Sequence, residues 1–217
     1  MGWLRSRPAA DASPEIRIYF DIIPTMSHTR IGILTDTHLG DPKLLWDEVG
    51  TAFAGVDLIM HSGDITGLKI LDRCEEWAPV IAALGNNDAG CEKDPRVKPM
   101  QLIDVEGFRI AMVHDMWPED DPIDVLVDQF LHGERADVFI SGDSHYERMD
   151  FREGVLQVNS GSPVLPHQWS PRLGTVATLD LEPGQLRAKI IRLGETPGLA
   201  NPGVEFTFDG TSVHRLG

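Results

Sequence analysis

Five apolar segments of this chain each end in side chains that could bind a metal ion. Those side chains are Asp36 and His38, then Asp64, then Asn86, Asn87 and Asp88, then His114, and finally Asp143 and His145. Taken singly, each has a commoner structural use, because aspartate and asparagine also cap helices and close turns. What indicates a functional site is that such residues recur, in order, at the ends of successive apolar segments. Carboxylates, an amide and neutral imidazoles together form a ligand set suited to divalent cations.

The apolar segments have the length and composition of buried β-strands. They cover residues 31–34, 58–60, 80–84, 110–113 and 138–140. The carboxyl ends of parallel strands share one edge of an α/β sheet, so we expect the polar residues that follow them to converge there. Gly63, Gly85 and Gly142 stand beside these residues and would let the backbone turn sharply or approach closely.

Helices are expected between the strands, and further strands after them. Asp-Pro pairs at 41–42 and 121–122 each provide an N-cap and a proline for the first turn. The first helix should extend to Phe53, and the second should end before Gly133. The later apolar segments lack intervening helices and are predicted as antiparallel strands; they cover residues 155–158, 175–181 and 187–193. The pattern predicts an α/β fold, a sandwich with mixed sheets.

The composition of the chain excludes several classes of protein. With 217 residues and 41% hydrophobic content, it can form one domain with a sizeable core. A net charge of −15 repels polyanions, so generic nucleic-acid binding is not expected. No uninterrupted apolar stretch approaches the roughly 18 residues of a membrane span. Two cysteines, Cys74 and Cys91, and no recognisable secretory signal lead us to expect free thiols and a cytoplasmic location.

The chain divides into an extension and a domain. Residues 1–26 are expected to form a weakly ordered N-terminal extension, because they contain three prolines and no continuous apolar core. An apolar stretch over residues 16–23 leaves open the alternative that part of the extension docks as an edge strand. Residues 27–217 are expected to form a single domain.

In their order and spacing, the motifs resemble those of the calcineurin-like metallophosphoesterases. The resemblance covers about residues 30–193 and is strongest to the small bacterial and archaeal phosphodiesterase branch, which includes the small subunit of retromer. The motifs are Asp36-Thr37-His38, Gly63-Asp64, Gly85-Asn86-Asn87-Asp88, His114 and Gly142-Asp143-Ser144-His145. The resemblance implies a sandwich of two mixed β-sheets flanked by helices, in the layer order αββα.

By position, the resemblance also implies two divalent metal ions. One would be held by Asp36, His38, Asp64 and His145, and the other by Asp64, Asn86, His114 and Asp143. Asp64 would then bridge the two ions. Such a pair activates water and stabilises the charge that develops during in-line attack on phosphorus. Mn²⁺ is the expected metal, with Mg²⁺, iron, Ni²⁺ and Zn²⁺ as alternatives.

The chain departs from the family pattern at two positions. Asn87 stands where many members have a histidine that protonates the leaving oxygen, and such general-acid help is worth roughly 10²–10⁴ in rate. We therefore expect a preference for esters with good leaving groups. Asp143 replaces the first histidine of the Gly-His-x-His motif, which lowers the positive charge of the site. This leaves open the alternative that the site binds one ion or none.

The remaining predicted site residues carry weaker signals. Asn87 and Asp88 are the predicted catalytic residues, and a turn formed by the two is the structural alternative for Asn87. Arg172 is the predicted contact of a substrate phosphate, with an ordinary ion pair as the alternative.

Together these features predict a dinuclear-metal phosphodiesterase that acts on small phosphoesters. The alternative is a non-catalytic, metal-binding interaction scaffold with the same fold. A homo-oligomer is compatible with either function.

Overall fold

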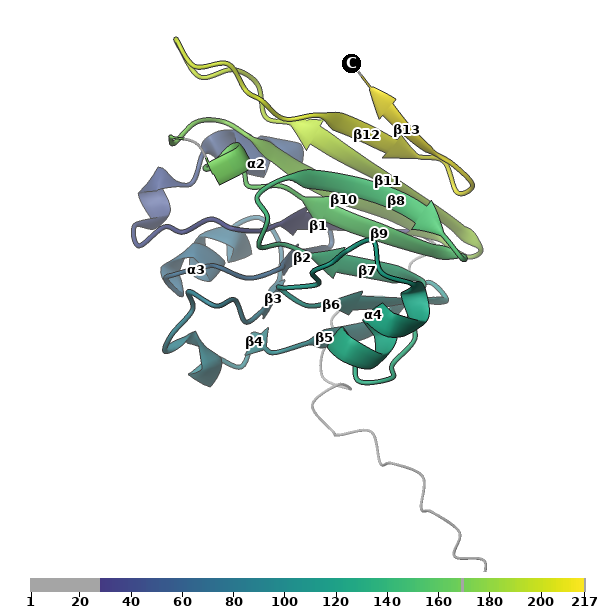
Figure 1. Ribbon diagram of the computed structural model, residues 1–217. Helices are drawn as coiled ribbons and strands as arrows, with labels where there is room; N and C mark the ends of the chain where they lie inside the picture. Colours follow the sequence, from purple (N-terminus) through teal and green to yellow (C-terminus); the bar gives the residue numbers. More distant parts are fainter. Residues whose placement is uncertain (1–27, 169, 217) are drawn as a thin grey trace, which may run out of the picture.

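Two β-sheets lie face to face at the centre of the fold (Figure 1). The computed structural model describes residues 28–168 and 170–216, so the extension predicted over residues 1–26 lies outside the described residues. The larger sheet contains, in spatial order, β13 (Val213–Leu216), β12 (Glu205–Phe208), β11 (Gln185–Arg192), β10 (Thr175–Glu182), β1 (Thr29–Leu34), β2 (Leu58–His61), β3 (Val80–Ala83) and β4 (Val97–Lys98). The smaller sheet contains β5 (Gln101–Val105), β6 (Phe108–Met112), β7 (Val138–Ser141), β9 (Val155–Ser160) and β8 (Glu147–Arg152).

Both sheets are mixed. β1, β2 and β3 are parallel, as are β6, β7 and β9. The antiparallel pairing predicted for residues 175–181 and 187–193 is confirmed by β10 and β11. The prediction for residues 155–158 is wrong in part, because β9 is antiparallel to β8 but parallel to β7. The reason is β8, a half-exposed strand that leads the chain back from the end of β7 to the start of β9 without a helix.

Apolar side chains fill three layers. The space between the sheets is closed by fully buried residues of both, among them Ile33, Met60 and Ile140. On the outer face of the larger sheet lie α2 (Asp47–Ala52) and α3 (Lys69–Glu75), and on that of the smaller sheet lies α4 (Ile123–Phe130). This is the αββα order that was predicted. Because the central strands are covered on both faces, their sequences are continuous apolar runs.

The helix predicted from Asp41 to Phe53 is interrupted. A 3-10 turn at Pro42–Leu44 is capped by the carboxylate of Asp41, which accepts a hydrogen bond from the Lys43 amide at 3.0 Å. The chain then becomes extended at Leu45, and α2 begins only at Asp47. The break turns Leu45 into the apolar layer beneath, where it is buried. The second predicted helix is confirmed as α4, and Gly133 follows its end with a φ of 85°.

Two further features complete the description. None of the helices in the described part of the chain has the length and apolar character needed to cross a bilayer. Both cysteines are free and buried, Cys74 in α3 and Cys91 in a 3-10 turn at Cys91–Lys93.

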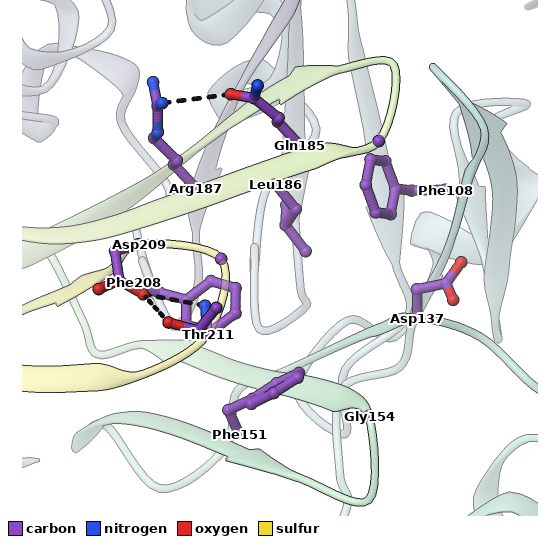
Figure 2. A pocket seen from close by; sticks show the side chains of 12 residues that line it. Phe108, Asp137, Phe151, Gly154, Gln185, Leu186, Arg187, Phe208, Asp209 and Thr211 are labelled. Atoms are coloured by element: carbon purple, nitrogen blue, oxygen red, sulfur yellow. Dashed lines mark hydrogen bonds between the residues drawn. The ribbon is translucent and has the colours of Figure 1, made fainter.

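A cavity of about 350 Å³ opens at the amino ends of β6, β7 and β9, between the two sheets (Figure 2). Its apolar wall is formed by Phe108, Phe151, Leu186 and Phe208. The rings of Phe151 and Phe208 lie with their centroids 4.9 Å apart. The predicted metal ligands follow the carboxyl ends of the same strands, so this cavity lies at the opposite end of the sandwich.

The layer between α4 and the smaller sheet gives a stability prediction. Phe139 is 1% exposed and packs there against Leu126. A Phe139→Ala variant should lose about 3–5 kcal/mol of unfolding free energy, because it leaves a cavity that a rigid core cannot close. Val125 on the same helix is 42% exposed, and Val125→Ala should change stability by about 0.5 kcal/mol or less. Urea denaturation of both variants measures the difference, and equal midpoints would contradict this packing.

Candidate metal centre

The predicted ligands meet where the carboxyl ends of strands from both sheets come together. Asp36 and His38 follow β1, Asp64 follows β2, Asn86 follows β3, His114 follows β6, and Asp143 and His145 follow β7. The first four therefore come from the larger sheet and the last three from the smaller one. The prediction that these polar side chains converge is confirmed. They converge from both sheets of the sandwich, and not from the edge of one sheet alone.

One group of donor atoms consists of Asp36, His38 and His145. The Nε2 atoms of the two histidines are 3.1 Å apart, and Oδ1 of Asp36 lies 3.7 Å from Nε2 of His145. The Nδ1 of His145 donates a hydrogen bond to the Leu165 carbonyl at 2.8 Å. In the neutral ring this leaves a lone pair on Nε2, which points at the other two residues.

A second group is centred on His114. Its Nδ1 donates to the Ser62 carbonyl at 2.8 Å, while its Nε2 faces three oxygens that can accept but not donate. They are Oδ1 of Asn86 at 3.0 Å, Oδ1 of Asp64 at 3.3 Å and Oδ1 of Asp143 at 3.6 Å. Acceptors converge in this way only around a proton or a cation. Burial opposes the charged ring of His114, but the carboxylates of Asp64 and Asp36 outweigh it and raise the pKa to about 9.

Asp64 lies between the two groups. Its Oδ1 faces His114, and its Oδ2 is 3.4 Å from Nε2 of His38. The backbone amide of Asn87 donates to Oδ1 at 2.9 Å, and the Asn87 side-chain amide donates to Oδ2 at 2.7 Å. Burial acts to raise the pKa of Asp64, but its hydrogen bonds with His114 and Asn87 lower the pKa overall. The carboxylate is therefore ionised and fixed in orientation.

Asp36 provides the test of whether a cation fits this cluster. Both of its carboxylate oxygens are buried, and neither has a hydrogen-bond partner among the described residues. Burial raises the pKa of Asp36 to about 7, because an ionised carboxylate is costly in the protein interior, although the ring of His114 opposes this shift. A divalent cation among the carboxylates, imidazoles and amide would supply that compensation. The donor set therefore fits a metal ion.

The backbone of the cluster is strained. Five of the seven predicted ligands have left-handed backbone: Asp36 (φ 53°), His38 (φ 48°), Asp64 (φ 56°), Asp143 (φ 66°) and His145 (φ 61°). For non-glycine residues such conformations cost about 1–3 kcal/mol each and gather at functional sites. Hydrogen bonds between the loops offset part of this cost, since Asp36 and His38 donate their amides to the carbonyls of Gly63 and Asp64.

Two glycines allow the loops to approach one another. A Cβ atom at Gly85 would lie 2.2 Å from the backbone nitrogen of Asp64. One at Gly142 would lie 2.1 Å from Oγ1 of Thr35 and 3.2 Å from Oδ2 of Asp36. Any larger residue would push the ligand loops apart, so both glycines serve close approach as predicted.

Asp88 and Ser162 fix the ligand loops by hydrogen bonds to backbone groups. Asp88 is buried, and its carboxylate accepts hydrogen bonds from the amides of Asp64 at 3.0 Å, Gly85 at 2.8 Å and Thr66 at 2.7 Å. Ser162 donates its hydroxyl to the Asp36 carbonyl at 2.8 Å. Asp88 thus acts on the cluster through the position of Asp64.

The other two predicted residues have different surroundings. Asn87 is exposed next to the cluster and contacts Asp64 as described above. Arg172 is largely buried, and its guanidinium donates to the Ser170 carbonyl, to Oγ of Ser170 and to the Ala200 carbonyl. These bonds direct it toward the segments around residues 170 and 200, and its contact with a substrate phosphate stays a prediction.

Sequence reasoning missed the carbonyls of Ser62 and Leu165, which orient the two imidazoles. No side-chain signal could have found them, because every residue has a carbonyl group.

The fold agrees with the comparison to protein families. The chain belongs to the calcineurin-like phosphoesterases, since the model of the Calcineurin-like phosphoesterase superfamily domain matches residues 29–184. A protein of Methanothermobacter thermautotrophicus named as a probable metallophosphoesterase is 35% identical over 172 residues, which cover 76% of this chain and 92% of that protein. The family resemblance predicted from the motifs is confirmed.

Solved structures share the fold. Vacuolar Protein Sorting 29 from Cryptosporidium parvum matches with a TM-score of 0.64 and 14% identity, covering 87% of this chain and 98% of that one. A structure described as a novel archaeal phosphodiesterase matches with a TM-score of 0.56 and 22% identity, covering 75% of this chain and 100% of that one. At these identities the likeness shows the fold alone.

An Asp36→Asn variant should have opposite effects with and without metal. Without metal, its melting temperature should equal or exceed that of the wild type, because a neutral amide replaces a buried carboxylate that accepts no hydrogen bond. With Mn²⁺ at 100 times its Kd, the wild type should gain about 2.7 kcal/mol and the variant much less. Differential scanning fluorimetry with and without chelator measures both effects.

Asp128→Asn is the matched control, because Asp128 is an exposed carboxylate of α4. It should follow the wild type in both conditions. An Asp36→Asn protein that loses stability without metal, yet retains the full manganese response, would contradict the ligand role.

Proposed function

We propose that this protein is a metal-dependent phosphodiesterase that hydrolyses small phosphoesters with good leaving groups. The observation that carries the proposal is the position of Asp64 between two groups of metal donors, with one carboxylate oxygen toward each. This arrangement suits two divalent cations that share one carboxylate. Such cations, when bound, polarise the phosphoryl oxygens and make water a better nucleophile.

The residues of this chain have distinct tasks in this proposal. Asp36, His38 and His145 would hold one ion, and Asn86, His114 and Asp143 would hold the other, with Asp64 contributing to both. The carbonyls of Ser62 and Leu165 orient the rings of His114 and His145 so that their Nε2 lone pairs would be available to these ions. Asp88 is a positioning residue that fixes the backbone of Asp64.

The leaving-group preference follows from Asn87. Its side-chain amide donates to Asp64, and an amide cannot supply a proton to a leaving alkoxide. Esters whose leaving group is stable as an anion need no such proton. A phosphodiester with an activated aryl group is therefore a better substrate than an alkyl phosphomonoester.

Asp143 supports manganese as the metal. Its carboxylate is 48% exposed, with Oδ1 3.6 Å from Nε2 of His114. An oxygen donor at this place, together with Asn86 and Asp64, makes the second group rich in hard ligands, which favour Mn²⁺ and Mg²⁺ over Zn²⁺. The cytoplasmic location and a homo-oligomeric state stay predictions.

Loss of the shared carboxylate should abolish the activity. Asp64→Asn should lower kcat/KM for bis(4-nitrophenyl) phosphate at least about 10²-fold with Mn²⁺, because a neutral amide cannot hold two cations together. Release of 4-nitrophenolate and elemental analysis of bound metal measure the two effects. Wild-type activity and metal content in this variant would rule out the shared role, and Asp128→Asn again serves as the control.

Restoring a proton donor should widen the range of substrates. Asn87→His should raise the rate for a methyl phosphodiester, whose leaving group is poor, by up to about 10²-fold. It should change the rate for the 4-nitrophenyl phosphodiester much less, because that leaving group needs no proton. The ratio of the two rates is the readout, since it cancels any change in metal content. An unchanged ratio would show that the leaving-group preference has another origin.

The scaffold alternative has one observation in its favour. The apolar cavity of Figure 2 lies at the end of the sandwich away from the metal ligands, and a partner could be bound there without use of the site. The likeness in fold to Vacuolar Protein Sorting 29 is compatible with this alternative. A protein that binds metal but turns over no activated diester would favour the scaffold.

A further inference from the structure

A second cavity, of about 560 Å³, borders the candidate metal centre. The cavity is adjacent to the second group of donors, because Asn86, His114 and Asp143 form part of its wall. The end of α4 also lines the cavity, at Gln129 and Phe130. The volume lies in the range of sites for small molecules, and the position next to the donors makes it accessible to a group attached to a bound phosphate.

The remaining lining residues are apolar, neutral polar or acidic. Leu84, Pro99, Val113 and Phe130 provide apolar surface, and Gln129 provides an exposed neutral amide. Asp115 is exposed at the rim, and its Oδ1 accepts a hydrogen bond from the Trp117 amide at 2.9 Å, which fixes the carboxylate in place. Neither lysine nor arginine is among the residues that line this cavity in the described part of the chain.

We infer that this cavity binds one ester substituent of the substrate and selects substituents that are uncharged or cationic. This inference rests on the proposed phosphodiesterase function and adds a substrate class to it. The wall combines apolar and polar surface, which suits a flat, weakly polar group such as an aryl or nucleoside residue. Asp115 repels a substituent with a second phosphate or a carboxylate, since neither lysine nor arginine lines the cavity beside it.

The selection depends on charge and is therefore sensitive to salt. Asp115 is exposed, so its repulsion of an anionic group weakens as the Debye length falls from about 30 Å at 0.01 M to about 3 Å at 1 M ionic strength. Discrimination against an anionic substituent should be about tenfold at low salt and should shrink in high salt. A steric origin would not show this dependence.

Two esters with the same leaving group test the inference. Phenyl 4-nitrophenyl phosphate and 4-carboxyphenyl 4-nitrophenyl phosphate differ by one carboxylate on the second substituent, and the salt dependence and Asp115→Asn separate the effect of its charge from that of its size. With Mn²⁺ at low salt, the wild type should have about tenfold higher kcat/KM for the phenyl ester. Asp115→Asn keeps the oxygen that accepts from Trp117, and it should reduce this ratio to about threefold or less.

Gln129→Glu should act in the opposite direction. It adds a negative charge at an exposed position of the same cavity, and it should increase the ratio several-fold. Asp128→Asn is the control, because Asp128 lies beside Gln129 in the chain but does not line the cavity. Its ratio should equal that of the wild type.

Binding measurements supply a readout that is independent of turnover. Isothermal titration calorimetry with phenyl methylphosphonate and its 4-carboxyphenyl analogue should give a higher Kd for the analogue that carries the carboxylate. The ratio of the two Kd values should be smaller in Asp115→Asn and larger in Gln129→Glu than in the wild type. Equal kcat/KM and equal Kd for the two members of each pair, or an unchanged ratio in Asp115→Asn, would overturn the inference. Absence of turnover for both esters would instead overturn the proposed function, while the phosphonates still decide whether the cavity discriminates by charge.

Discussion

The structure depends on the burial of two carboxylates, Asp36 and Asp64, where the two sheets meet. Asp64 is compensated by hydrogen bonds from Asn87 and by the ring of His114, whereas Asp36 has no hydrogen bond to its side chain among the described residues. Such an arrangement is stable only with positive charge nearby. The imidazole orientations, the left-handed backbone and the close glycine contacts all follow from the need to bring donors around that charge.

Much of the fold could be predicted from the sequence. Strands such as β2 are covered on both faces and so appear as uninterrupted apolar runs, each followed by polar residues at the shared edge. Elements that lie half in solvent gave no such signal, which is why β8 and the parallel pairing of β9 escaped prediction. The break at Leu45 escaped as well, because burial of this side chain outweighs the helical spacing of its neighbours.

Only some of the contacts in the candidate site could be predicted from the sequence. Residue types and order predicted that Asp64 and His114 would meet, because each follows a strand that ends at the common edge. They could not predict that both amides of Asn87 would be used by Asp64, or that Arg172 would be held by Ser170 and Ala200. These contacts depend on the paths of loops, and a short polar side chain can satisfy its hydrogen bonds in many ways.

The division of the donors between two sheets has a consequence for the maturation of the protein. A nascent chain that has completed only β1, β2 and β3 carries Asp36, His38, Asp64 and Asn86, which are three of the four donors of one predicted ion and two of the four donors of the other. The imidazoles of His114 and His145 arrive with the second layer, and only its docking brings their nitrogens to the carboxylates. A cation that uses the full donor set would therefore be bound only after closure of the sandwich, and it would then cross-link the two layers.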